Sequence, residues 1–418
     1  MTRKTNVAVI GAGAAGLACA GRAAELGCVV TLFEKNKKVG VKLSITGKGR
    51  CNVTNDCTPR EVIENIPTNP KFMFGALNSF PPAYVKDFFE GLGVPLKTER
   101  GNRVFPASDR AKDVVDALKR YCTENGVKIV YEKVNRIVLD NGKCTGLETR
   151  SGFRAFDRVI VCTGGLSYPR TGSDGDGFTF AREAGLKVRS ACPSLVPLET
   201  EESWSHTMPG LSLKNAAIKV TDSETGKKIY SDFGEMLFTH TGVSGPMVLS
   251  ASAHMKNMSR GRYKVHVDLK PALDERTLDR RILSDFAKYS NRNFENALGD
   301  LLPRMMIPVV VKLTDIPGTK KVNVISNTER KRLGAVIKDL CVTVKSFRPI
   351  SEAIITSGGV EVTQIDPRTM QAKNVEGLFF AGEVIDVDAY TGGFNLQIAF
   401  STAFTAAGGA AERNENNV

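Results

Sequence analysis

Residues 7–16 have the sequence VAVIGAGAAG, in which four apolar residues are followed directly by glycines at positions 11, 13 and 16. The apolar run is typical of a buried parallel strand, and residues 14–26 predict an alanine-rich helix that ends at Gly27. A Gly-x-Gly-x-x-Gly pattern between a strand and a helix allows a tight turn, close approach of the backbone to a pyrophosphate, and close helix–strand packing. This stretch therefore predicts the start of a dinucleotide-binding domain.

Glu34 supports the same prediction. It follows a second apolar run, Val29–Phe33, and lies roughly 20 residues beyond the last glycine, where a carboxylate can accept hydrogen bonds from ribose hydroxyls. The alternative for Glu34 is a surface acid at the start of a loop.

Three later segments favour FAD over NAD as the dinucleotide. Residues 159–165 (VIVCTGG) form an apolar strand that ends in small residues, as where a backbone approaches a cofactor closely. Together with residues 171–177 (TGSDGDG) and 375–383 (VEGLFFAGE), they resemble, in order, the FAD-contact segments of glutathione-reductase-type and fumarate-reductase-type flavoproteins. Most of those proteins have aspartate where this chain has Glu383. The cofactor is expected to be bound non-covalently.

A glycine pair near the C-terminus opens another predicted helix. Residues 392–397 (GGFNLQ) precede the apolar run 398–407, and a helix that starts there can direct its positive end at the flavin ring. The alternative is a simple glycine turn into a core helix.

The middle of the chain has a different pattern from its two ends. Residues 263–269 alternate polar and apolar residues, as a half-buried strand does, and residues 273–340 have a helical pattern interrupted by prolines. We predict an α/β fold with a two-dinucleotide-binding-type Rossmann FAD domain, an inserted β-rich, barrel-like domain and a small helical domain. The predicted boundaries are 1–193 with 356–418 for the FAD domain, 194–271 with 341–355 for the β-rich domain, and 272–340 for the helical domain.

Three further motifs suggest a family. Residues 47–55 (GKGRCNVTN), 238–246 (FTHTGVSGP) and 392–397 (GGFNLQ) together resemble the BaiN/RdsA-like (YhiN-like, aminoacetone-oxidase-type) FAD-dependent oxidoreductases, nearly from end to end. The resemblance implies a two-part FAD domain with a β-rich insert and a helical insert. It also implies a flavin redox enzyme, whose relatives act in C=C reduction on small molecules, amine oxidation or uridine reduction in ribosomal RNA.

The Gly-x-Gly-x-x-Gly pattern, the strand ends and the family motifs define a predicted set of cofactor-binding residues. This set is Gly11, Gly13, Ala14, Ala15, Gly16, Glu34, Lys35, Lys42, Gly49, Arg50, Cys51, Asn52, Val134, Thr163, Gly164, Gly165, Asp176, Gly382, Glu383, Gly392, Gly393, Phe394, Asn395 and Leu396. Within it, Arg50 is expected to neutralise the pyrophosphate or an anionic substrate.

His240, Asp386 and Tyr390 are the predicted catalytic residues. Histidine titrates near neutral pH and suits general acid–base work, while the other two lie between the third FAD segment and the final helix. Each has a structural alternative: His240 as a hydrogen-bonded residue of the β-rich domain, and the others as loop-stabilising residues.

Cysteine spacing argues against a redox disulfide and against a metal site. Five residues separate Cys51 from Cys57, one more than in the glutathione-reductase-type pair, and no C-x-x-C pair occurs. Buried or loop cysteines are the expected state.

Composition leaves the substrate open. The net charge of +12 fits a solvated surface with a phosphate-binding mouth, or a polyanionic partner such as RNA. No apolar stretch approaches the ~20 residues that cross a bilayer, and an odd number of cysteines favours a reducing compartment, so a cytoplasmic protein without a membrane partner is expected. Three functions follow: a small-molecule oxidoreductase transferring hydride through flavin N5, with NAD(P)H as a transient reductant; an rRNA-modifying flavoenzyme; or a non-catalytic flavin sensor.

Overall fold

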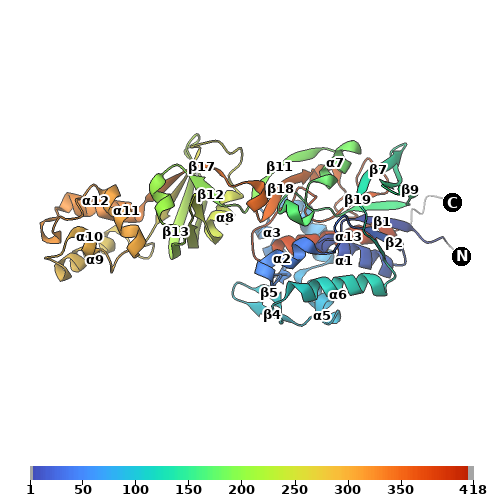
Figure 1. Cartoon of the computed structure of the whole chain (residues 1–418), viewed down its shortest axis with the longest axis horizontal. Helices are drawn as coiled ribbons and strands as arrows, with labels where there is room; N and C mark the ends of the chain where they lie inside the picture. The colour runs from blue at the N-terminus through green and yellow to red at the C-terminus, as the bar shows by residue number, and fades with distance from the viewer. Residues whose placement is uncertain (1–2, 413–418) are drawn as a thin grey trace. The chain divides into compact units, whose positions relative to one another are not determined.

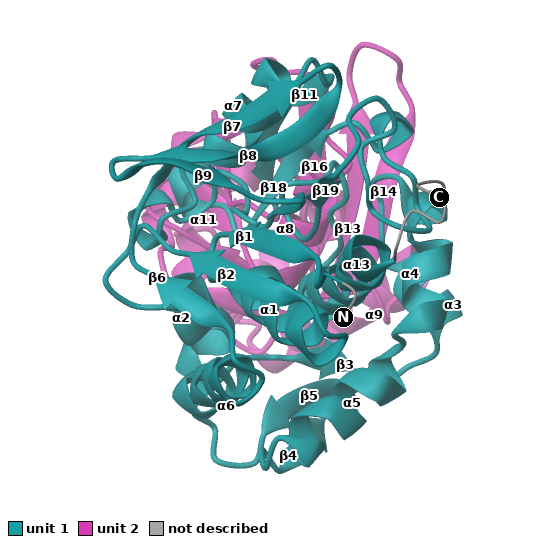
Figure 2. Ribbon diagram, turned by 90° about the vertical axis from the view of Figure 1, so that its right-hand side faces the viewer, with its two compact units in different colours: residues 1–194, 350–418 teal, residues 195–349 magenta. Residues whose placement is uncertain are grey.

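The computed structural model describes residues 3–412 of the chain. It contains two compact units, one formed by residues 1–194 and 350–418 and the other by residues 195–349 (Figure 2). The first unit thus combines both ends of the sequence.

A parallel sheet forms the centre of the first unit. Its strand order is β19-β10-β1-β2-β6, and all neighbouring strands are parallel. The strands are β1 (Asn6–Ile10), β2 (Val29–Phe33), β6 (Lys128–Val130), β10 (Arg158–Val161) and β19 (Leu378–Phe380). Because they are parallel, their carboxyl ends lie along one edge, where ligands bind in open α/β sheets.

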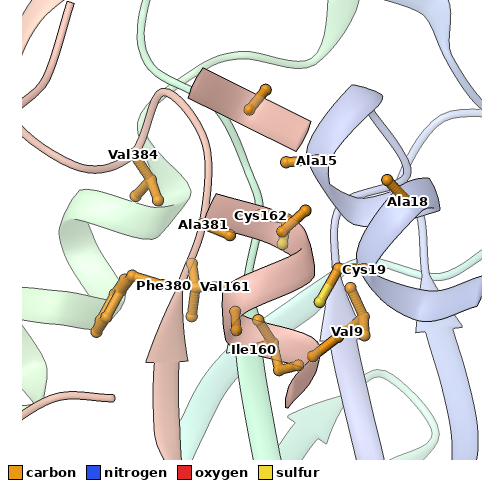
Figure 3. Close-up of a cluster of buried hydrophobic side chains, with 14 of the residues drawn as sticks. Val9, Ala15, Ala18, Cys19, Ile160, Val161, Cys162, Phe380, Ala381 and Val384 are labelled. Atoms are coloured by element: carbon orange, nitrogen blue, oxygen red, sulfur yellow. The ribbon is translucent and has the colours of Figure 1, made fainter. Parts of the chain in front are cut away.

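Two helices pack together beside this sheet. Helix α1 (Ala14–Glu25) follows β1 and contacts α13 (Phe394–Ala411), the last helix of the chain. Both lie next to β1 in Figure 1, although one is blue and the other red. Figure 3 shows the apolar side chains that α1 and the strand ends bury together, among them Val9, Cys19 and Ile160.

The other elements of the first unit surround this centre. Two antiparallel three-stranded sheets are formed by β3 (Thr54–Asn55), β4 (Leu96–Glu99) and β5 (Arg103–Pro106), and by β7 (Val134–Asp140), β8 (Lys143–Thr149) and β9 (Gly152–Ala155). An antiparallel pair is formed by β11 (Val188–Ser194) and β18 (Ile355–Val360). The remaining helices are α2 (Val41–Gly49), α3 (Pro59–Glu64), α4 (Phe74–Ser79), α5 (Pro82–Gly91), α6 (Ala111–Glu124) and α7 (Asp176–Glu183), with short 3-10 turns at Pro70–Met73, Pro169–Thr171, Ile350–Glu352 and Val362–Gln364.

The second unit contains a closed barrel of six strands. In order around the barrel these are β12 (Leu198–Thr200), β15 (Gly242–Ser244), β14 (Lys228–Phe238), β13 (Ser212–Asp222), β16 (Tyr263–Asp268) and β17 (Leu340–Phe347). Val220, Val265 and Val342 are among its fully or almost fully buried side chains, as the period-2 pattern of the strands requires.

The same unit contains five helices, of which the first follows strand β15 and the other four lie between strands β16 and β17. They are α8 (Pro246–Ser252), α9 (Glu275–Lys288), α10 (Phe294–Ala297), α11 (Ile307–Thr314) and α12 (Asn327–Lys338), with 3-10 turns at Ser203–Thr207, Arg304–Met306 and Val322–Val324. Leu278, Leu333 and Val310 join the apolar core of this unit.

The predicted fold class is confirmed: the sequence of a Rossmann-type domain built from both chain ends is interrupted by an insertion that contains a barrel and helices. The two units meet in sequence at residues 194/195 and 349/350, and the finer division into three domains stays a prediction. The final helix begins at Phe394, four residues before the predicted apolar run.

A substitution at Gly16 tests the packing of α1 on β1. A Cβ at this position would lie 1.7 Å from the carbonyl oxygen of Gly11, whereas a Cβ on Gly408 in α13 would meet nothing within 4 Å. Gly16→Ala should therefore destabilise the protein by about 2 kcal/mol or more, because the backbone has to move. Gly408→Ala should leave stability unchanged or raise it by about 0.5 kcal/mol. Urea unfolding of both variants measures the difference, and equal stabilities would contradict the packing described.

Candidate active site

A large cavity opens at the carboxyl edge of the parallel sheet. The space within and in front of it measures about 1330 Å³, open solvent at its mouth included, and all of its lining residues belong to the first unit. The lining comes from the ends of β1, β2, β10 and β19, and from the starts of α1, α2, α7 and α13. Segments from both ends of the sequence thus meet around one space.

The glycine turn after β1 forms one wall of the cavity. Gly11 has φ +97°, and its N–H donates to the Phe33 carbonyl at 2.8 Å. In helix α1 the first intrahelical bond runs from Leu17 N–H to the Gly13 carbonyl. The N–H groups of residues 14–16 therefore have no acceptor within the helix, as at any helix N-terminus, and they give this wall a positive end.

Glu34 holds this turn in place from the end of β2. It is 7% exposed, and its Oε2 accepts the Ala12 N–H at 2.8 Å while Oε1 accepts the Asn36 N–H at 2.8 Å. A carboxylate has about four lone-pair positions, so Glu34 can accept two further hydrogen bonds from a ligand in the cavity. Glu34 is therefore a buried residue and not a surface acid, and its bonds to the turn leave it free to bind a ligand as well.

Ion pairs connect three segments near Glu34. Lys35 contacts Asp174 and lies 2.8 Å from Oδ2 of Asp176, whose Oδ1 lies 3.0 Å from Lys133. Burial raises the pKa of Asp176, but the hydrogen bonds and charges of the two lysines outweigh burial and hold this pKa below its ordinary value. At this part of the wall, ion pairs rather than apolar contacts hold the three segments together.

A second cluster of polar side chains lies at the cavity wall formed by the end of β19 and the start of α2. Lys42 Nζ lies 2.5 Å from Oε2 of Glu383 and 2.7 Å from Ser167 Oγ. Oε1 of Glu383 accepts from Ser167 Oγ and from the Thr356 N–H, both at 2.9 Å. Glu383 thus joins segments that are far apart in the sequence.

The start of α13 forms a further part of the wall. Asn395 and Leu396 line the cavity, and the Asn395 amide binds the loop before the helix: its Oδ1 accepts the Ala389 N–H at 2.9 Å and its Nδ2 donates to the Ala389 carbonyl at 2.7 Å. The N-terminus of the helix is thereby fixed in direction at the cavity.

The cavity fits a dinucleotide. A Cβ on Gly13 would meet no protein atom within 4 Å, so the space beside this backbone is open for a phosphate to approach closely. Thr163 lines the same cavity. Together with Glu34 and the positive end of α1, these features supply donors for phosphate and acceptors for ribose.

Most of the predicted cofactor-binding residues meet at this cavity. Its lining includes Gly11, Gly13, Ala14, Ala15, Glu34, Lys35, Lys42, Val134, Thr163, Gly164, Asp176, Gly382, Glu383, Asn395 and Leu396. The other predicted residues are outside its lining: Gly16, Gly49, Arg50, Cys51, Asn52, Gly165, Gly392, Gly393 and Phe394. Their direct role in binding the cofactor stays a prediction.

Arg50 shows why one of these residues lies outside the lining. Its guanidinium contacts Glu99, donates to Oδ1 of Asp109 at 2.7 Å and lies 4.2 Å from the ring centroid of Phe105. Its charge is therefore paired within the protein. The sequence motif around it carries no information about these distant partners.

The predicted catalytic residues do not line the cavity. Asp386 and Tyr390 flank the lining residue Val387 at one and three positions along the chain, and the Tyr390 N–H donates to the Asn65 carbonyl. His240 is exposed in the turn between β14 and β15 of the second unit. Their catalytic roles stay predictions.

None of the nine cysteines forms a disulfide in the structure. Burial raises the pKa of the Cys51 thiol to about 12 and that of Cys57 to about 11. Thiols with such pKa values are poor nucleophiles. Among residues 3–412, no group of three or more histidine, cysteine, aspartate or glutamate side chains is arranged to hold a metal ion.

Several lining residues were not predicted from the sequence. Ser173 lies inside the TGSDGDG run and could have been found from it, and Lys133 is next to the predicted Val134. Leu43, Ile354 and Ile355 also line the cavity, but they are ordinary apolar residues that no sequence signal distinguishes.

The comparisons with known proteins agree with this geometry. The model of the HI0933-like protein Rossmann domain matches residues 5–409. The 3-dehydro-bile acid delta(4,6)-reductase of Clostridium scindens is 29% identical, over 98% of this chain and 99% of its own. A ribosomal RNA dihydrouridine synthase of Haemophilus influenzae is 30% identical, over 97% and 98% of the two chains. A chain of the quinol fumarate reductase from E. coli has a similar fold, with a TM-score of 0.51 and 16% identity over 99% of this chain and 72% of that one.

Fold and cavity define a Rossmann-type flavoenzyme, an oxidoreductase that uses FAD. The chain belongs to the HI0933-like Rossmann family, which confirms the resemblance expected from its motifs. The hypothesis of a non-catalytic sensor is accordingly set aside. No helix within residues 3–412 combines the length and the apolar character that crossing a bilayer requires.

A substitution at Gly13 distinguishes an effect on cofactor binding from an effect on folding. Its backbone, with φ −84° and ψ −162°, is accessible to alanine, and an added Cβ meets only the open cavity. Gly13→Ala should keep the unfolding free energy of the FAD-free protein while weakening FAD binding at least about tenfold, because the methyl group occupies the space of the phosphate. Gly299→Ala, which also adds a Cβ with nothing within 4 Å, is the matched control. Titration of the FAD-free proteins with FAD measures the effect, and unchanged affinity would place the phosphate elsewhere.

The ion pairs of Asp176 with Lys35 and Lys133 should make the stability of the protein depend on pH. A carboxyl whose pKa is lowered by folding stabilises the protein above its ordinary pKa, 3.8, and this stabilisation is lost as pH falls through the lower folded pKa. Asp176→Asn should reduce the unfolding free energy by about 1 kcal/mol at pH 7. In acid the difference between wild type and variant should shrink to zero. Urea unfolding across this pH range tests it, and a difference that grows in acid would be incompatible with the pairing.

Proposed function

We propose that this enzyme reduces a carbon–carbon double bond conjugated to a carbonyl group, with electrons supplied by NADH or NADPH. The observation that carries the proposal is the shared chemistry of two relatives that match the chain over nearly its full length. A delta(4,6)-reductase of a 3-dehydro-bile acid and a dihydrouridine synthase both add hydrogen across such a bond. Their substrates differ in size and charge, but the bond that is reduced is of one type.

The residues of the cavity would bind and orient the cofactor for this reaction. Bound FAD supplies two-electron redox chemistry. The glycine turn and the N-terminus of α1 would hold its phosphates, and Glu34 would accept a ribose hydroxyl. The N-terminus of α13, fixed by Asn395, would stabilise negative charge on the ring.

The electron donor would bind transiently. The sequence contains no second Gly-x-Gly-x-x-Gly after a strand, so a dedicated nicotinamide domain of that type is not expected. A nicotinamide would instead reach the cavity through the opening that the substrate uses, and the two would alternate.

The acceptor has two candidates. The first is a small unsaturated ketone, which suits a cavity with apolar lining residues such as Leu43, Ile355 and Val387. The second is uridine in ribosomal RNA, which the charge distribution favours: residues 195–349 contain 24 lysines and arginines against 17 aspartates and glutamates, a surplus of seven out of the total of +12. A basic unit attracts a polyanion.

Single-turnover kinetics distinguish these acceptors. The protein would be reduced anaerobically with NADH or NADPH and mixed with a 3-oxo-4-ene steroid, with unmodified ribosomal RNA, or with buffer, while flavin absorbance is followed. We expect one acceptor to reoxidise the flavin at least about tenfold faster than buffer, with a product that has gained two hydrogens by mass spectrometry. The RNA reaction, and not the steroid reaction, should slow steeply as salt rises. Reoxidation at the buffer rate with both acceptors would refute the proposal.

A further inference from the structure

Two buried carboxylates flank a residue of the cavity wall. Asp386 is 2% exposed and Asp388 is 1% exposed, and Val387 between them lines the cavity. Neither carboxylate belongs to the lining. The pair therefore lies in the protein interior, separate from the cofactor-binding residues described above.

Each carboxylate has one bonded oxygen and one bare oxygen. Oδ2 of Asp386 accepts from Asn69 Nδ2 at 3.1 Å and lies 3.6 Å from Nε of Arg189, while Oδ2 of Asp388 accepts from Ser194 Oγ at 2.9 Å. Oδ1 of each has no hydrogen-bond partner among the described residues. A bare carboxylate oxygen in the interior is strongly unfavourable.

Thr68 provides a third bare oxygen at the same place. It is 8% exposed, its Oγ1 has no partner among residues 3–412, and its backbone forms an antiparallel bridge with Asp388. Bridged residues project their side chains to the same side, so the hydroxyl is directed toward the Asp388 carboxylate. A ligand that accepts electron pairs from all three of these oxygens would satisfy them together.

The charges of this cluster do not balance. Among the described residues, the ion pairs of the two carboxylates include one cation, Arg189. One negative charge is left over. Burial raises the pKa of Asp386, and the Asp388 carboxylate adds to this change, although Arg189, Asn69 and the Gly358 backbone N–H oppose it. One more positive charge would relieve this repulsion.

We propose that Thr68, Asp386 and Asp388 bind a monovalent alkali cation, Na⁺ or K⁺. Oxygen atoms are the ligands that hard cations take, and a single positive charge balances the cluster. A cation accounts for the three bare oxygens and for the excess negative charge together, whereas a bridging water would leave the excess charge in place. Asn69, Arg189 and Ser194 occupy the Oδ2 atoms, which leaves both Oδ1 atoms for the ion.

Thermal unfolding of the FAD-loaded protein tests the proposal without an activity assay. Melting temperature would be measured in NaCl, KCl and choline chloride at equal ionic strength and pH 7. We expect NaCl or KCl to raise it by several degrees over choline chloride, with saturation as the concentration increases, because the ion binds the folded state alone.

Two variants locate the ion. Asp388→Asn removes a charged ligand, and Thr68→Val removes the hydroxyl at nearly constant volume while keeping both carboxylates, so it serves if Asp388→Asn does not fold. Both should lose the difference between alkali chloride and choline chloride. Asp116→Asn, an exposed helical position paired with Lys112, should keep it.

Three results would overturn the proposal. One is equal melting temperatures in the three salts, which would leave a proton or water as the missing partner. Another is an alkali response that persists in Thr68→Val, which would place the ion elsewhere. The third is a loss of the response in Asp116→Asn, which would mark it as a general surface-charge effect.

Discussion

The close approach of Gly11 and Gly16 is the constraint on which the cavity depends. The Gly11 carbonyl oxygen occupies the space that a side chain at residue 16 would need. Because residue 16 is glycine, α1 can begin directly over the end of β1. The Gly11 N–H bonds to Phe33, and the Ala12 N–H bonds to Glu34. These contacts fix the N-terminus of α1 beside the end of β2, and they leave the open space next to Gly13 that a phosphate needs.

Segments far apart in the sequence complete the same cavity because the parallel sheet aligns their ends. Strand β10 lies between β1 and β19, so Thr163 and Glu383 follow neighbouring strands to one edge. The Glu383 carboxylate then connects Lys42, Ser167 and Thr356. The insertion of 155 residues between the two halves of the domain leaves this alignment intact, because it departs from and returns to the antiparallel pair β11–β18.

The sequence was informative where backbone chemistry is constrained and less so where tertiary contacts decide. Glycine spacing and apolar runs predicted β1, α1 and β10, because few residue types allow those turns and close contacts.

Arg50 looked like a phosphate ligand, yet Glu99 and Asp109 pair with it from a hairpin that no local pattern connects to it. Ile355 begins β18, which pairs with β11, and it lines the cavity together with its neighbour Ile354, but apolar residues carry no signal of which space they face. Asp386 was predicted as a catalytic residue; the structure places its carboxylate outside the cavity lining, and its catalytic role stays a prediction.

The stoichiometry of FAD in the purified protein tests the central claim most directly. The account predicts a yellow protein with one FAD per chain, released intact by heat denaturation because no covalent bond holds it. A colourless protein that takes up no FAD on incubation would contradict the account, since the cavity formed by the two ends of the chain would then hold something else.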